Sequence, residues 1–157
     1  MFIETERFGS FEIDDDKSIN FPAGLPGFED LHTFIIIKNS DSYPIYWLQS
    51  AEDKYIALPV VVPFDIVNEY IIQIRDDELR ELKVECQDDL LITNVVVIPE
   101  DITKMTANLA APIIINAKLG LGKQIIIDAK EMPIRFPIYD AVMKVLKEGS
   151  KDAGTIA

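Results

Sequence analysis

The sequence is poor in the side chains that most often carry catalysis or bind metal ions. Its 157 residues include one histidine, His32, and one cysteine, Cys86. A structural zinc site takes about four Cys or His ligands, so we expect no metal and no other cofactor. A nucleophilic triad would need His32, which FEDLHTF places in a loop before a strand. Cys86 lies among Glu85, Asp88 and Asp89, which disfavour a reactive thiolate. We therefore expect no enzymatic activity.

A phosphate-binding loop is also missing, although Gly120–Lys123 (GLGK) looks like part of one. The first glycine of that motif would fall at Ala117, and Gln124 follows the lysine where Ser or Thr must bind magnesium. A hairpin turn between strands at Ile113–Asn116 and Gln124–Asp128 explains these glycines better, because glycine tolerates positive φ.

Long apolar runs are absent as well. No run approaches the roughly 20 residues that cross a bilayer, so no contact with a membrane is expected. The first residues, MFIETERF, contain both acids and a base, unlike a signal peptide. The single cysteine cannot form an internal disulfide, so the fold does not depend on an oxidising compartment. We expect a cytoplasmic protein that acts as a monomer.

Positive charge is scarce. The chain has 15 Lys and Arg residues against 27 Asp and Glu residues, a formal net charge of −12. Such a chain repels phosphate backbones, which argues against direct nucleic-acid binding. Its field would attract basic protein partners, although acidity also serves solubility alone.

The acids gather in two clusters. One is Asp14–Asp16, and the other is Asp76–Asp89, where seven acids and two bases leave a local net charge of −5. Nothing within the second window offsets this repulsion. We weigh a solvated helix face against a docking patch for a basic protein. The acidic candidates for partner contact are Asp76, Asp77, Glu78, Glu81, Asp14, Asp15 and Asp16.

Most of the chain has the local pattern of β-strands: short runs rich in Ile, Val, Tyr and Trp between turn-forming residues. Several runs are continuous rather than alternating, which indicates burial on both faces. A hairpin is expected from Phe2–Phe8 and Phe11–Ile13, with its turn at Gly9–Ser10. The other predicted strands are Ser18–Phe21, Thr33–Lys38, Ile45–Gln49, Tyr55–Val62, Tyr70–Ile74, Leu90–Ile98, Ile113–Asn116 and Gln124–Asp128.

Two segments have the pattern of short helices. Asp76–Val84 begins with acids, and Asp76 or Asp77 is the expected N-cap. Pro137–Glu148 has apolar residues at helical spacing, and a glycine follows it. We predict one mostly β domain over residues 1–150, with short antiparallel strands in a β-barrel-like or sandwich fold and one or two short helices. Residues 151–157 are expected to form a flexible tail.

Four uncharged polar residues interrupt the apolar stretch MTANLAAPIIINAKLGLGKQIIID: Thr106, Asn108, Asn116 and Gln124. Asn and Thr readily bond to nearby backbone, so we interpret them as residues that order the turns around the strands. Partner contact by Asn108 or Asn116 is the alternative.

Five motifs follow one another over about 120 residues. They are TERFG at 5–9, INFPAGLPGFE at 19–29, WLQS at 47–50, a proline and a tyrosine at 63 and 70, and MTANL, AP, IIIN and Gln124 within 105–124. In these motifs, along nearly its whole length, the chain resembles the FliW family of flagellar assembly factors.

The resemblance implies a small, β-barrel-like bacterial protein of the cytoplasm without enzymatic activity. Members of the family bind flagellin before its export. When flagellin is depleted they bind the RNA-binding translational repressor CsrA instead, so that flagellin mRNA is translated. Flagellin and CsrA are therefore the partners that the resemblance predicts.

Two other classes of protein remain as alternatives. A small-molecule-binding β-barrel would use the polar residues of the MTANL stretch in a large, mostly apolar cavity. An enzyme ranks third, because the sequence has one histidine, one cysteine and no recognisable catalytic motif.

Overall fold

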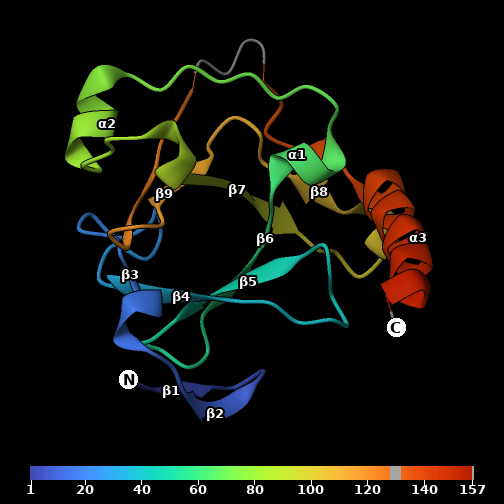
Figure 1. Cartoon of the computed structure of the whole chain (residues 1–157), viewed down its shortest axis with the longest axis horizontal. Helices are drawn as coiled ribbons and strands as arrows, with labels where there is room; N and C mark the ends of the chain where they lie inside the picture. Colours follow the sequence, from blue (N-terminus) through green and yellow to red (C-terminus); the bar gives the residue numbers. More distant parts are fainter. Residues whose placement is uncertain (128–131, 157) are drawn as a thin grey trace.

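Seven strands close into a β-barrel in the computed structural model of the chain, which describes residues 1–127 and 132–156, with side chains through residue 148 (Figure 1). The ring runs β7-β6-β5-β4-β3-β10-β9 and closes by pairing β9 with β7. Its strands are β3 (Ile19–Asn20), β4 (Thr33–Ile37), β5 (Tyr46–Ser50), β6 (Ala57–Val61), β7 (Leu90–Val97), β9 (Ile113–Asn116) and β10 (Leu121–Gln124).

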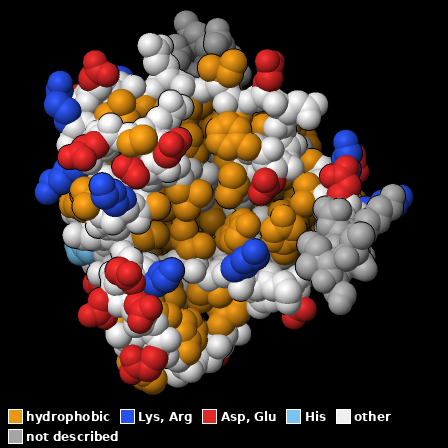
Figure 2. Space-filling model, in the orientation of Figure 1, with side chains coloured by type: hydrophobic (Ala, Val, Ile, Leu, Met, Phe, Trp, Pro, Cys, Tyr) orange, Lys and Arg blue, Asp and Glu red, His pale blue; other side chains and the backbone are white. Residues whose placement is uncertain are grey.

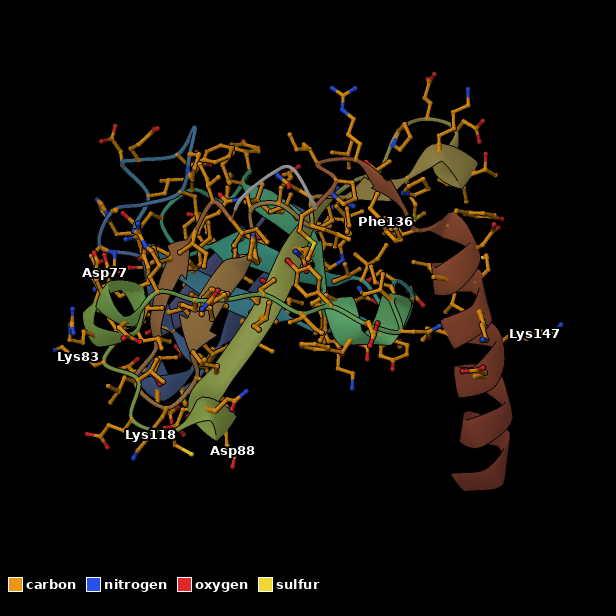
Figure 3. The ribbon with its side chains drawn as sticks, turned by 90° about the horizontal axis from the view of Figure 1, so that it is seen from above. Asp77, Lys83, Asp88, Lys118, Phe136 and Lys147 are labelled. Carbon is orange, nitrogen blue, oxygen red and sulfur yellow. The ribbon has the colours of Figure 1, made fainter. Side chains whose placement is uncertain are left out.

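The remaining elements lie around this barrel. They are the hairpin β1 (Phe2–Thr5) and β2 (Gly9–Glu12), the short strands β8 (Thr106–Ala107) and β11 (Phe136–Pro137), the helices α1 (Pro63–Ile66), α2 (Asp76–Glu81) and α3 (Tyr139–Ile156), and 3-10 turns at Asp15–Lys17, Gln87–Asp89 and Ile102–Lys104. Helices α2 and α3 lie at opposite ends of the molecule (Figures 1 and 3). The prediction of a mostly β, barrel-like fold is confirmed.

One pair of barrel strands is parallel, which corrects the expectation of antiparallel strands throughout. Strand β10 pairs with β3 in parallel, with Leu121 opposite Asn20, while the other barrel pairs are antiparallel. A closed ring with an odd number of strands cannot alternate direction all the way round, so one parallel pair follows from the count.

Alternate residues of the strands face into and out of the barrel. Phe21, Phe34 and Leu48 are fully buried in the cluster that fills the interior. In β9, Ile113 packs in that cluster while Ile114 packs outside it, so burial on both faces is confirmed for this strand. The filled interior argues against the small-molecule-binding barrel, because such a protein needs a large cavity there.

Two glycines allow the β9–β10 hairpin to fit against β3. Gly120 has φ +67°, and a Cβ atom there would lie 2.5 Å from the carbonyl oxygen of Ser18. Gly122 is in β10 itself, where a Cβ atom would lie 2.5 Å from Cε1 of Phe21. The hairpin prediction is right, but only Gly120 serves the turn; Gly122 makes room for a core aromatic ring.

Several predicted boundaries were wrong. The N-terminal turn is at residues 6–8 and not at Gly9–Ser10, because the Thr5 hydroxyl donates to the Gly9 carbonyl and accepts from the Phe8 amide. Tyr70–Ile74 pairs with no described strand. Of the predicted strand Gln124–Asp128, Gln124 is the last residue of β10, and Asp128 lies outside the described residues.

The helices also differ from their predicted limits. The N-cap of α2 is Arg75, with no side-chain cap, so Asp76 and Asp77 lie inside the helix. Pro137 belongs to β11, and α3 begins at Tyr139 and continues to Ile156. The glycine expected to end α3 is inside it, because one glycine weakens a helix by only about 1 kcal/mol. The flexibility of residues 151–157 stays a prediction.

Candidate partner-binding surface

Helix α2 is short and is held mainly at its C-terminal end. That end is a Schellman motif, in which the Lys83 amide donates to the Arg80 carbonyl and the Val84 amide to the Leu79 carbonyl, both at 3.0 Å. Lys83 has φ +55°, the left-handed conformation that glycine usually supplies. The absence of a glycine explains why the sequence did not reveal where this helix ends.

Asn116, at the end of β9, fastens α2 to the barrel. Its Nδ2 donates to the carbonyls of Leu82 at 2.9 Å and Lys83 at 3.2 Å, and its Oδ1 accepts from the amides of Lys118 and Leu119. The residue is 1% exposed. Its side chain bonds only to backbone, as the turn-ordering interpretation predicted, and its burial leaves almost no surface for a partner.

Glu78 is enclosed by two cations. Its Oε1 lies 3.1 Å from Arg75 Nη2, and its Oε2 lies 2.7 Å from Lys123 Nζ. The second contact is a close ion pair, not a well-aligned hydrogen bond. Lys123 also contacts Glu81 at 2.7 Å. Lys123 is the chief cause that holds the pKa of Glu78 below its usual value, and Glu78 in turn raises the pKa of Lys123.

Cations from outside the Asp76–Asp89 window offset part of the repulsion among the acids of α2. Lys123 lies 42 positions from Glu81 in sequence, and Arg75 lies just before the window, where it also contacts Asp77 at 3.3 Å. Glu78 is 8% exposed, so its carboxylate has little surface left for contact with a partner. Asp76, Asp77 and Glu81 remain at the surface.

The exposed acids of α2 differ in direction, because Glu81 contacts Lys123 of the barrel strand β10 at 2.7 Å. Figure 3 shows Asp77 at the outer side of α2, far from α3. On the face in Figure 2, acidic and basic side chains lie around a broad central area of hydrophobic side chains. A charged rim around an apolar centre is the usual organisation of a protein-binding surface.

The other acidic cluster is separate from α2. Asp14, Asp15 and Asp16 are exposed near the N-terminus, and their turn lies below α2 in Figure 1. Asp15 lies 3.1 Å from the Met1 amino group. The two clusters therefore belong to different elements, the 3-10 turn Asp15–Lys17 and helix α2.

The polar residues of the MTANL stretch mostly bond to backbone. Asn108 is half-buried, and its Oδ1 accepts from the Ala110 amide at 3.0 Å. Gln124 donates to the Ala111 carbonyl at 2.9 Å. Thr106 is a half-buried residue of β8. The side chain of Asn108 therefore stabilises the turn, and part of its surface is still open to a partner.

A groove next to α2, lined by both apolar and polar side chains, was missed by the sequence reasoning. It has a volume of about 690 Å³ and lies between the segment before α2 and the residues after β10. Its lining includes Ile71, Gln73, Glu78, Ile126 and Met132. Ile71 and Ile126 are 77% and 84% exposed. Both lie in segments predicted as strands, so their outward faces were expected to be covered by neighbours.

The described part of the chain offers little for catalysis. Its residues contain no group of three or more His, Cys, Asp or Glu side chains placed to hold a metal ion. His32 lies at the surface with Nδ1 3.0 Å from the Phe21 carbonyl oxygen, and Cys86 is exposed. Within the same residues, no helix combines the length and apolar character needed to span a bilayer.

Comparison with known proteins gives consistent matches. The family model described as FliW protein matches residues 2–138. The flagellar assembly factor FliW of Thermoanaerobacter pseudethanolicus is 45% identical over 141 residues, which cover 89% of this chain and 94% of that protein. The protein of the same name from Alkaliphilus metalliredigens is 36% identical, with coverage of 96% and 94%. A crystal structure of the flagellar assembly factor FliW superposes with a TM-score of 0.81 at 27% identity, covering 88% of this chain and 96% of the other.

Proposed function

The chain belongs to the FliW family of flagellar assembly factors, and from this we propose that it binds flagellin in the cytoplasm. When free of flagellin, it binds the translational repressor CsrA and antagonises it, which relieves repression of flagellin mRNA. It does so as a monomer and without enzymatic activity. The protein thereby couples the synthesis of flagellin to its consumption.

The observation that carries the CsrA part of this proposal is the set of exposed acids on α2. An RNA-binding protein needs a basic surface, and an acidic partner attracts it over a range set by the salt concentration. Asp76, Asp77 and Glu81 are exposed on a helix whose C-terminal end is fastened by the buried Asn116. A fixed group of exposed acids supports recognition of a basic partner.

Charge reversal tests the role of α2. We expect the double variant Asp76→Lys/Asp77→Lys to weaken CsrA binding by about tenfold at low salt and to flatten the dependence of affinity on salt. Glu78 is left unchanged, because its reversal would also break its ion pairs with Arg75 and Lys123. The matched control is Asp14→Lys/Asp16→Lys, which makes the same change in net charge at exposed positions of the other acidic cluster.

Calorimetric titration of each variant with CsrA at two salt concentrations gives the answer. A tenfold loss confined to the α2 variant supports docking through α2. An equal loss in both variants would mean that only net charge matters. A loss confined to the control would move the contact to the Asp14–Asp16 turn.

Competition between the two partners is the second test. We expect flagellin to displace CsrA from the protein during size-exclusion chromatography, because the proposed switch needs binding of one partner to oppose binding of the other. A stable complex of all three proteins would contradict this mechanism while leaving the separate binding reactions intact.

A further inference from the structure

Two of the sequence motifs, TERFG and WLQS, meet where the turn of the N-terminal hairpin lies on the outer face of β5. The guanidinium carbon of Arg7 lies 4.2 Å from the centre of the Trp47 ring, and the centre of the Phe8 ring lies 5.9 Å from it. Leu48 packs inside the barrel, so its neighbours Trp47 and Gln49 face outward. The turn therefore covers the ring of Trp47, and cation–π attraction to Arg7 holds the turn there.

The rest of the hairpin has few ties to the barrel. Strands β1 and β2 form a two-stranded sheet of their own, which lies below the barrel strands in Figure 1. Among the described residues, one backbone hydrogen bond joins this sheet to the barrel, from the Glu6 amide to the Lys54 carbonyl at 3.0 Å. Ile3 is the one fully buried residue of the hairpin. An isolated two-stranded hairpin is marginally stable, so these few contacts decide its position.

The seam between the hairpin and the barrel is loosely packed. One cleft of about 280 Å³ is lined by Glu6 and Arg7 from the turn and by Gln49. A second cleft, of about 570 Å³, lies beside β1. Lys54 and Tyr55, between β5 and β6, line both clefts. Protein interiors are normally close-packed, so fewer contacts are lost here when the hairpin lifts than at a dense interface.

Gln49, beneath the turn, opposes closure of the hairpin. Its Nε2 donates to the carbonyls of Ser50 at 3.0 Å and Lys54 at 3.4 Å. Its Oε1 is buried and has no hydrogen-bond partner among the described residues. A buried acceptor without a donor is unfavourable, and water can supply the donor once the hairpin lifts. The closed arrangement therefore includes a cost that opening relieves.

We infer that the β1–β2 hairpin is a movable flap, latched by Arg7 and Phe8 on Trp47, which opens while the barrel stays folded. Opening breaks the hydrogen bond between Glu6 and the β5–β6 connection, and it exposes the outer face of β5. The flap turns about the chain between β2 and β3, where the 3-10 turn Asp15–Lys17 has no buried residue. The inference is independent of the proposed function, because the flap opens without a partner.

Amide hydrogen exchange on the unmodified chain is the first test. We expect the Glu6 amide to exchange at least tenfold faster than the Ser50 amide, after correction for intrinsic rates, because a local opening takes less free energy than global unfolding. The Ser50 amide is the reference, since it bonds to the Ile56 carbonyl across β5 and β6 at 2.8 Å. Equal protection of the two amides would mean that the hairpin opens only when the barrel unfolds, and would refute the flap.

A matched pair of double variants tests the latch. Arg7→Ala/Phe8→Ala removes both side chains from the Trp47 ring. Arg135→Ala/Phe64→Ala makes the same changes at exposed positions elsewhere, where Phe64 also contacts another aromatic ring. We expect the first variant to speed exchange of the Glu6 amide by about tenfold, since it loses one cation–π and one aromatic contact. The control should change this rate less than about twofold.

Fluorescence adds a second readout, because Trp47 is the only tryptophan of the chain and is buried. Acrylamide should quench Trp47 more strongly in the latch variant than in the control. Stronger quenching with unchanged exchange of the Glu6 amide would mean that the two side chains only shield the ring, which refutes the latch. Faster exchange of the Ser50 amide in the latch variant would show that hairpin and barrel open together, which refutes the independent flap.

Discussion

Asn116→Ala should detach α2 from the barrel without unfolding the rest of the protein. The side chain makes four hydrogen bonds, two to carbonyls at the C-terminal end of α2 and two to amides of the β9–β10 turn. The amides of Lys118 and Leu119 belong to exposed residues, so water replaces the lost acceptor there. The carbonyl of Leu82 belongs to a residue that is 3% exposed, and it has no such replacement.

The expected loss follows from this difference. A buried carbonyl left without its donor costs about 1–3 kcal/mol, and each bond that water replaces costs about 0.5 kcal/mol. Water can also reach the carbonyl of the exposed Lys83, so one buried carbonyl and three replaceable bonds are lost, and we expect Asn116→Ala to lower the free energy of unfolding by about 2.5–4.5 kcal/mol. Asn108→Ala is the control, because Asn108 is a half-buried turn residue whose Oδ1 accepts from one amide; its loss should be about 1 kcal/mol.

Asn116→Asp separates the two halves of the network. A carboxylate still accepts from the Lys118 and Leu119 amides, but its other oxygen faces the carbonyls of Leu82 and Lys83. Burial beside these oxygens raises the pKa of the new carboxyl, so the variant should be least stable above that pKa and regain stability as the pH falls. At pH 7 the loss should be about 3–5 kcal/mol, as for an uncompensated buried charge.

Urea unfolding measures these losses, and amide exchange locates them. In Asn116→Ala, the amides of Leu79 and Leu82, which bond within and beside α2, should exchange faster while the amides of the barrel strands keep most of their protection. A loss below 1 kcal/mol, or unchanged exchange in α2, would refute the view that Asn116 fastens this helix.

Three further predictions concern α2 and the barrel. Glu78→Gln should lower the free energy of unfolding by about 1 kcal/mol at pH 7. Because the folded-state pKa of Glu78 is lowered, the difference from wild type in urea unfolding should disappear as the pH falls below about 4. A difference that persists there would contradict the ion-pair origin. Lys83→Gly should raise the free energy of unfolding by about 1 kcal/mol, because glycine has no penalty at φ +55°; Lys83→Ala, which keeps the penalty, should give no such gain. Gly122→Ala should lower the melting temperature through a loss of about 1–3 kcal/mol, since its Cβ would overlap the Phe21 ring; an unchanged melting temperature would mean that the ring moves at little cost.

The sequence predicted the barrel strands well, because runs rich in Ile and Val indicate buried strands. Ile113–Ile115 must be covered on both sides, and the barrel interior and an outer cluster cover it. Tyr70–Ile74 has the same composition, yet it pairs with no described strand. Pairing depends on which segment lies alongside, and a local pattern carries no information about that.

The candidate surface was predictable in position but not in detail. The pattern of acids located α2, and the fold kept Asp76, Asp77 and Glu81 exposed. Glu78 cannot be told from its neighbours by sequence, because its burial depends on Lys123 from β10. The groove was missed because Ile71 and Ile126 were each expected to lie in a covered strand.

The sequence by itself determined that this chain is an acidic, mostly β protein with few catalytic side chains, and its motifs identified the FliW family. Those properties reside in residue types and their spacing, which need no coordinates. Only the tertiary structure decided that the ring closes through β7 and β9, that Glu78 of α2 is paired with Lys123 of a distant strand, and that Ile71 and Ile126 line one groove. Each depends on contacts between segments far apart in the chain, and the energy of such contacts is set by geometry that no local pattern specifies.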